Sequence, residues 1–359
     1  MTYQTHDPIN FSGGPHDIGY AYGTACSQLI AEIVDASLSY YREYCDLNKT
    51  AILRAAKKYH PFIIDYAPRI GEEIAGISEG SERSLEEILL LVASYEMFTR
   101  HGGGGVGCTS VAVTGAATAN GETFVGQTLD EAFEPWGENF SRIVHVTPRS
   151  GPKFVQYAYP GFPGQMGLNS CGIALCSNTL VSGEHRFGVP FQVIAHEILQ
   201  QKSIGEALNA ITRAKRATSV NFLISDENGE IYDIETTPRS YDCFYSNERM
   251  VHTNHFLSAK LDVRRDVFLE CLNDTMIRYN RMTRLLRNMP QESTLQHLMD
   301  AFKDHVNYPN SICRHPDETQ PPKDRMRTAD CMIFSTTRKT IWLCKGNPCQ
   351  TGFQKLEIS

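Results

Sequence analysis

The pattern of apolar residues changes near residue 101, and this change restricts the fold more than any other feature of the sequence. In residues 17–45, apolar residues recur at spacings of three and four, which predicts a helical face formed by Ile30, Ile33, Val34 and Leu38. After residue 107, short apolar runs of the kind found in strands follow one another closely. Helical segments occur again at 190–214 and 266–306. Strands packed between helices predict an α+β sandwich.

Local signals support several of these elements. Asn120-Gly121 and Asn228-Gly229 each lie between two strand-like runs, which predicts two hairpins. Ser84 followed by Glu87 is a capping box, so a helix should begin just after Ser84. With 359 residues the chain is long enough for one large domain or two ordinary ones.

Charge and cysteine content exclude several classes of protein. The net charge is −7 and no basic stripe occurs, which argues against nucleic acid or an anionic membrane as the partner. No apolar run approaches the ~20 residues that cross a bilayer, and the first residues do not resemble a secretory signal. Eleven cysteines without a CxxC pair indicate a reducing, cytoplasmic setting, with most of them acting as small buried apolar residues.

Two short motifs suggest an α/β-hydrolase but lack the required context. Residues 76–80 fit G-x-S-x-G, and residues 101–104 fit the HGGG oxyanion loop of esterases. The serine of that motif should follow a strand, whereas Ser78 lies in a helical, charged stretch. The oxyanion loop should also precede the serine in the chain, and here it follows, so we reject this interpretation.

His252 and His255 form the remaining pattern that could indicate a metal-binding site. In a strand, side chains three residues apart point to opposite faces, and no Cys/His cluster with ligand spacing accompanies this pair. We therefore expect no metal site.

Cys108 is the residue with the most unusual surroundings. A single cysteine is ordinarily a small apolar residue, here at the head of a strand. Gly107 before it leaves the carbonyl of the intervening peptide bond unhindered, and the Gly102–Gly105 run allows unusual backbone conformations. Two hydroxyl residues, Thr109 and Ser110, follow.

These features suit an N→S acyl shift, in which Cys108 attacks the carbonyl of Gly107. Hydrolysis of the resulting thioester would leave Cys108 as a new N-terminus. Its α-amino group, with an ordinary pKa of ~7.7–8.0, could then act as the base for its own thiol. No separate histidine is needed in such a mechanism.

At this point the sequence resembles the acyl-coenzyme A:6-aminopenicillanic acid (isopenicillin N) acyltransferase family of N-terminal nucleophile hydrolases, relatives of the β-alanyl-dopamine hydrolases. The resemblance spans nearly the whole chain and is carried by segments in the same order as in the family, at 13–23, 76–91, 107–110, 126–130, 167–175, 250–255 and 307–314. It implies a four-layer αββα fold with a largely helical N-terminal pro-segment. It also implies cleavage between Gly107 and Cys108 into chains of residues 1–107 and 108–359, which stay associated as one compact domain without a covalent link.

The resemblance also implies roles for individual residues. Cys108 would be the nucleophile, with its α-amine as base, and Asn254 would donate to the oxyanion. Asp130 would orient the new N-terminus, and Arg314 would hold Asp130 or an acyl or carboxylate group. The ordinary alternatives are a turn residue for Asp130 and a surface ion pair for Arg314.

Candidates for the substrate pocket are four polar residues close to these motifs: Thr109, Ser110, Asn169 and Ser311. Cys171 and Cys176 could line the same pocket, although packing in the core is the ordinary interpretation of both.

Several functions agree with this pattern. The first is a self-processing amidohydrolase or N-acyltransferase that passes an acyl group from Cys108 to water or an amine, without a cofactor. Its substrate would be a small-molecule acyl amide or acyl thioester, and a homo-oligomer is compatible with the sequence. The alternatives are an acyl-CoA-dependent transferase acting on a β-lactam or other small amine, an unprocessed relative without activity, and a Cys/His hydrolase that uses His101, His252 or His255.

Overall fold

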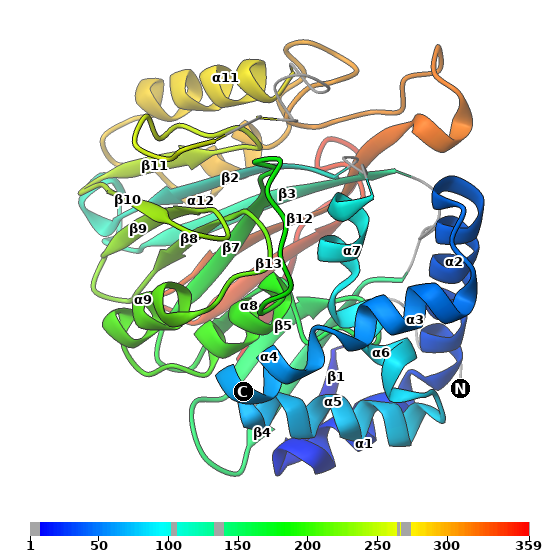
Figure 1. The fold of residues 1–359 in the computed structure, drawn as a ribbon. Coiled ribbons are helices and arrows are strands. Elements are labelled where there is room, and N and C mark those ends of the chain that lie inside the picture. The colour runs from blue at the N-terminus through cyan, green and yellow to red at the C-terminus, as the bar shows by residue number, and fades with distance from the viewer. Residues whose placement is uncertain (1–7, 102–105, 133–139, 264–265, 267–273, 359) are drawn as a thin grey trace. The chain divides into compact units, whose positions relative to one another are not determined.

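The computed structural model of the chain describes residues 8–101, 106–132, 140–263, 266 and 274–358. The chain divides into two compact units, and most of their elements are labelled in Figure 1. The first comprises Met1–Gly103, Pro135–Gly167 and His185–Thr218. The second comprises Gly104–Glu134, Leu168–Glu184 and Ser219–Ser359, so Gly107 and Cys108 both belong to the second unit.

The first unit is mainly helical, as predicted for the N-terminal segment. Its helices are α1 (Pro15–Ala25), α2 (Ser27–Cys45), α3 (Lys49–Lys57), α4 (His60–Tyr66), α5 (Pro68–Ser81), α6 (Leu85–Val92), α7 (Ser94–Arg100), α8 (Phe191–Leu199) and α9 (Ile204–Arg213). Its strands are β1 (Ile9–Gly13), β4 (Arg142–Pro148) and β5 (Phe154–Ala158). β1 pairs in parallel with β4, and β4 pairs antiparallel with β5.

Two details of this unit differ from the prediction. Residues 17–45 form two helices and not one, because the chain breaks at Cys26 between α1 and α2. The predicted face lies on α2 and is confirmed for Ile30, Ile33 and Val34, which are fully buried, while Leu38 is half-buried. β1 was not predicted, because its five residues gain hydrogen bonds only from β4, far along the chain. The capping box is confirmed: the Glu87 N–H donates to Ser84 Oγ, and Glu87 Oε2 accepts from the Ser84 N–H.

Glycines bring α1 and α5 into backbone contact. A Cβ atom on Gly19 would collide with the carbonyl of Glu73, and one on Gly76 or Gly80 would collide with the backbone of α1. Ser78 lies inside α5 and donates to the Arg83 carbonyl at 2.6 Å. The G-x-S-x-G segment is therefore a helix-packing surface, in agreement with its rejection as a nucleophile elbow.

The second unit holds two sheets. One contains β7 (Ala174–Thr179), β8 (Val220–Ser225), β9 (Ile231–Thr236) and β10 (Tyr241–Tyr245), antiparallel in that order. The other runs β11 (Arg249–His252), β2 (Val106–Val113), β3 (Phe124–Ala132), β12 (Met326–Ser335), β13 (Thr340–Lys345) and β14 (Gln354–Glu357). β6 (Met166–Asn169) contains the boundary between the units. The helical elements are α11 (Asp274–Asn288), α12 (Leu295–Ala301) and two short turns, η1 (Gly115–Ala117) and η2 (Pro322–Asp324).

Both predicted hairpins are present in this unit. Gly121 lies between β2 and β3 with φ +72°, and Gly229 lies between β8 and β9 with φ +89°, a backbone region that favours glycine. The predicted helix 294–306 ends early, at Ala301, and Asp304 Oδ1 accepts from the Val306 N–H in the turn that follows. The predicted helix 266–288 is described only from Asp274 onward.

Strand alternation gives β2 two different faces. Val111 and Val113 pack with Met282 and Phe302 in a core beneath α11 and α12, which lie on the outer side of the six-stranded sheet (Figure 1). On the opposite face, Ser110 Oγ donates to Asn178 Oδ1 of β7 at 2.6 Å. In the second unit, α11 and α12 therefore pack on one face of the six-stranded sheet, and the other face packs against the sheet that contains β7. The predicted α+β class is confirmed.

None of the helices that the structure describes has the length and apolar character needed to cross a bilayer.

Candidate active site

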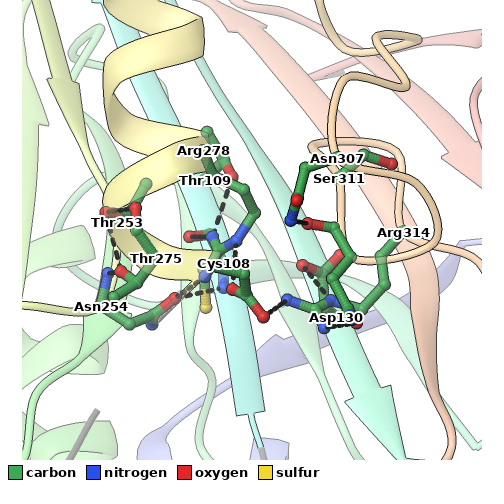
Figure 2. Close-up of polar contacts among 12 residues, drawn as sticks. Cys108, Thr109, Asp130, Thr253, Asn254, Thr275, Arg278, Asn307, Ser311 and Arg314 are labelled. Atoms are coloured by element: carbon green, nitrogen blue, oxygen red, sulfur yellow. Dashed lines mark hydrogen bonds and ion pairs between the residues drawn. The ribbon is translucent and has the colours of Figure 1, made fainter. Parts of the chain in front are cut away.

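Cys108 lies in β2 opposite Leu129 of β3, and its neighbour Gly107 lies opposite Asp130. The residue is 1% exposed. Figure 2 shows it between two polar groups, Asn254 with Thr253 and Thr275 on one side, and Asp130 with Arg314 on the other. Four separate segments of the second unit therefore meet around the predicted nucleophile.

Asn254 contacts the backbone of Cys108 directly. Its Oδ1 accepts from the Cys108 N–H at 2.8 Å, and its Nδ2 donates to Thr179 O at 3.2 Å and to Thr179 Oγ1 at 3.1 Å. The Asn254 N–H donates to Thr275 Oγ1 at 2.8 Å. The carbonyl end of the amide thus faces the nitrogen that would become the free amine, while the Nδ2 group is bound to Thr179.

Asp130 and Arg314 form the second predicted pair. Arg314 Nε lies 3.4 Å from Asp130 Oδ2, and Thr328 Oγ1 donates to Asp130 Oδ1 at 2.7 Å. Both ionic residues are almost fully buried, at 0% and 1% exposure, so Arg314 is not the surface ion pair of the ordinary interpretation. The structure brings Asp130 and Arg314 together beside Gly107.

A second buried pair, which we did not predict, completes the charge balance. Arg278 Nε lies 3.0 Å from Asp274 Oδ1, and Arg314 Nη2 lies 2.8 Å from Asp274 Oδ2. Two carboxylates and two guanidinium groups are thus held in one buried cluster. Such a cluster is tolerated in a protein interior only when its charges compensate one another.

Arg278 also connects this cluster to Cys108. Its Nη1 donates to the Cys108 carbonyl at 2.5 Å and to Thr109 Oγ1 at 3.0 Å, and its Nη2 donates to Asn254 Oδ1 at 3.0 Å. The available sequence signal was the Asp274-Arg278 spacing of four within a predicted helix. Nothing local distinguished that pair from an exposed helical ion pair.

The thiol of Cys108 is protonated in the continuous chain. Burial raises its pKa to about 11, and the charge of Asp130 adds to this effect, while Asn254 and Arg278 oppose it. Burial also raises the pKa of Asp130, an effect opposed by Arg314 and Arg278. As a nucleophile, Cys108 would therefore need a base close by, because its thiolate is scarce at neutral pH.

The four pocket candidates are all buried, and each has a partner within the protein. Thr109 accepts from Arg278, Ser110 donates to Asn178, and Ser311 Oγ donates to the Cys313 carbonyl at 2.6 Å. Asn169 Oδ1 accepts from the N–H groups of Cys171 and Ile173, both at 3.0 Å. Asn169 thus shapes a turn.

The histidines named for a Cys/His mechanism have other partners. His252 Nε2 lies 2.8 Å from Glu235 Oε1, and its Nδ1 lies 2.8 Å from the Thr253 carbonyl. His255 Nδ1 lies within hydrogen-bond distance of Thr253 Oγ1 and Thr275 Oγ1. His101 is exposed at the end of α7, and the Gly102–Gly105 run that follows lies outside the described residues.

A cavity of about 670 Å³ lies in the second unit, and its lining residues come from β9, β10, β11 and α11 and include Asp233, Arg249 and Tyr279. Cys108 is not one of its lining residues. This cavity therefore does not expose the thiol in the continuous chain.

Comparison with known proteins gives the family. A profile of the acyl-coenzyme A:6-aminopenicillanic acid acyl-transferase family matches residues 117–350, and the chain belongs to this family. It is 28% identical over 343 residues to the acyl-coenzyme A:6-aminopenicillanic-acid-acyltransferase 40 kDa form of Emericella nidulans, covering 95% of this chain and 92% of the relative.

Solved structures of lower similarity also match. Penicillin V acylase from Agrobacterium tumefaciens aligns with a TM-score of 0.46 and 14% identity, over 66% of this chain and 83% of its own. A variant of conjugated bile acid hydrolase from Clostridium perfringens aligns with a TM-score of 0.49 and 14% identity, over 70% and 97%.

Proposed function

We propose that the chain is a self-processing cysteine N-terminal nucleophile amidohydrolase or N-acyltransferase that carries its acyl group on Cys108. The observation that supports this most is the contact between the Cys108 N–H and Asn254 Oδ1. It places a hydrogen-bond acceptor at the nitrogen that cleavage would free, inside a buried and charge-balanced cluster.

Processing would begin when Cys108 Sγ attacks the carbonyl carbon of Gly107. The C–N bond breaks, the thiol proton passes to the leaving nitrogen, and a thioester joins Gly107 to Cys108. Water then hydrolyses this thioester, which gives a Gly107 carboxylate, a free thiol and a free α-amine. A Cβ at position 107 would lie 3.2 Å from Asp130 Oδ2, so glycine suits the crowded leaving side of this bond.

In the processed enzyme, the α-amine of Cys108 would accept the thiol proton. An ordinary α-amine has a pKa of ~7.7–8.0, so a substantial fraction is unprotonated at neutral to mildly alkaline pH. The thiolate would attack an acyl amide, the leaving amine would take the proton, and an acyl thioester would remain on Cys108. Water or an acceptor amine would then release the acyl group.

The surrounding residues would have positioning roles. Asn254 Oδ1 and Arg278 hold both ends of the Cys108 backbone, and Asp130 with Arg314 supports the adjacent strand. Donation from Asn254 Nδ2 to an oxyanion would require exchange of its bonds to Thr179.

A second candidate uses an acyl-CoA thioester as the donor and a β-lactam or other small amine as the acceptor. It is favoured by the name of the Emericella nidulans relative. The chemistry on Cys108 would be the same, and only the leaving group would change from an amine to a thiol.

Intact mass spectrometry tests the proposal directly. The wild-type protein should show two masses, for residues 1–107 and 108–359, and these two chains should still elute together in gel filtration. Cys108→Ala should show the single mass of the uncleaved chain. Cys176→Ala is a matched control, because Cys176 is also buried in the second unit. Acyl amides and acyl thioesters should each add one acyl mass to the 108–359 chain.

A Cys108→Ala chain that still splits would refute self-cleavage by this thiol. A wild-type chain that stays whole and accepts no acyl group would indicate a relative without activity.

A further inference from the structure

We propose that, contrary to the expectation from the sequence, the second unit contains a structural zinc site formed by His305, Cys313, His315 and Cys349. The ligand atoms of these four side chains all lie within 4.8 Å of one another. The site is separate from the chemistry proposed for Cys108, and it would be present whether or not the chain is processed.

Four of the six distances between the ligand atoms are close to those of a regular tetrahedral site. With Zn–S of about 2.3 Å and Zn–N of about 2.0–2.1 Å, a regular tetrahedron places S and S about 3.8 Å apart, S and N about 3.6 Å apart, and N and N about 3.3 Å apart. The sulfur atoms of Cys313 and Cys349 are 3.5 Å apart, and the Nε2 atoms of His305 and His315 are 3.2 Å apart. His315 Nε2 lies 3.7 Å from Cys313 Sγ and 3.3 Å from Cys349 Sγ.

The chemistry of the four ligands favours zinc over calcium or magnesium. Two thiolates and two imidazoles are the donor set of structural zinc sites, whereas calcium and magnesium prefer oxygen. Binding would displace one proton from each thiol into solvent, with both imidazoles neutral, and no electron transfer is involved. Four protein ligands fill the tetrahedron, so the metal would have no open position for substrate.

The site ties together two segments that surround the active-site arginine. Three ligands come from the connection between α12 and β12, and Cys349 comes from the turn that follows β13. Cys313 and His315 are the immediate neighbours of Arg314 in the chain. Figure 2 shows the Arg314 side chain reaching from this connection to Asp130.

A buried amide links the proposed ligands to Arg314. Asn347 Nδ2 lies 3.4 Å from Cys313 Sγ and donates to the Arg314 carbonyl at 2.6 Å. Hydrogen bonds from such neighbours orient metal ligands and tune their affinity. The metal would thus fix the backbone that holds Arg314 beside Asp130 and Asp274.

The test is metal analysis of the full-length protein, purified without chelators and titrated with zinc alone. The wild type should hold one zinc per chain, and Cys349→Ser and His305→Asn should lose it; both positions are exposed, so neither change should prevent folding. Cys243→Ser, a half-buried cysteine of the same unit, should keep the metal. Asn347→Ala should weaken zinc binding by roughly 10–100-fold.

Cobalt substitution checks the ligands themselves. Cobalt in the wild type should show thiolate charge-transfer absorption, which should weaken in Cys349→Ser and persist in Cys243→Ser. Three results would overturn the proposal: a wild type that takes up no zinc on titration, equal zinc content in Cys349→Ser and wild type, or a Cys313–Cys349 disulfide in the freshly purified protein.

Discussion

Replacing Arg278 by methionine removes a buried positive charge and keeps an unbranched, flexible side chain that is shorter and apolar. Arg278 is 0% exposed and lies 3.0 Å from Asp274 in the cluster around Cys108. The substitution leaves Asp274 with only Arg314 as a charged partner in that cluster, and it removes a hydrogen bond to the Cys108 carbonyl. The cluster then carries an uncompensated negative charge.

The cost follows from these losses. Breaking a buried ion pair by removing one partner costs about 3–5 kcal/mol, and the remaining Arg314 contact places this case near the lower end. A buried carbonyl without its donor adds about 1 kcal/mol or more. We therefore expect Arg278→Met to lower the free energy of unfolding by about 4 kcal/mol.

A second substitution should recover part of this loss. Asp274→Asn in the same chain removes the uncompensated charge and leaves Asp130 paired with Arg314. The double variant should be more stable than the sum of the two single changes predicts, by roughly 1–3 kcal/mol.

Urea unfolding measures the free energies of the parent chain, the two single variants and the double variant, which together form a double-mutant cycle. The variants are made in a Cys108→Ala background, so that every chain remains whole, and the shift in midpoint gives the change in free energy when the slope is constant. Arg281→Met is the control, because Arg281 lies on the same helix and pairs with Asp304 while 27% exposed. Its loss should cost about 0–1 kcal/mol. The reasoning is refuted if the Arg278 and Asp274 effects are additive, or if Arg278→Met costs no more than Arg281→Met.

Three further predictions follow from individual environments. Gly107→Ala places a Cβ 3.3 Å from the Cβ of Asp130. An overpacking cost of about 1–3 kcal/mol in the transition state of cleavage would slow chain splitting by roughly 5- to 150-fold in cell-free translation, and an unchanged rate would contradict this. Burial raises the pKa of Glu96 to about 7, so its contribution to stability is complete below the ordinary carboxyl pKa and is lost as pH rises toward 7. Glu96→Gln should therefore raise the free energy of unfolding in urea by roughly 3 kcal/mol at pH 8 and leave it unchanged near pH 4. Ser311→Ala loses the hydrogen bond to the Cys313 carbonyl, so the free energy of unfolding should fall by about 1 kcal/mol. The KM for an acyl amide should not change, and a raised KM would indicate that this hydroxyl contacts the substrate.

Much of the fold was predictable because its signals are local. The hairpins at Gly121 and Gly229 need a positive φ that glycine adopts readily, and the helix after Ser84 is set by a hydrogen bond between residues three apart. Strand pairing between distant segments has no such local signal in the sequence. The parallel pairing of β1 with β4 joins Ile9 to Val144, and neither segment alone shows that partner.

The sequence predicted which main residues lie together at the candidate site, but it did not predict the hydrogen bonds between them. Cys108, Asp130, Asn254 and Arg314 do meet in the second unit. The structure alone showed that the Asn254 carbonyl oxygen, and not its amide nitrogen, faces Cys108 in the continuous chain. The direction of an amide depends on all of its neighbours, and here these come from β2, β7 and α11.

The sequence by itself determined the helical first hundred residues, the strand-rich remainder, the two glycine turns and a cysteine placed after an unhindered carbonyl. These depend on backbone preferences and on periodicities that act over a few residues. Only the tertiary structure decided that Arg278 compensates the charge of Asp274 next to Cys108, because burial makes that compensation necessary. It alone also showed that Cys349 lies 3.3 Å from His315, 34 residues away in the sequence, because contacts between distant residues depend on where the chain returns in space and not on spacing along it.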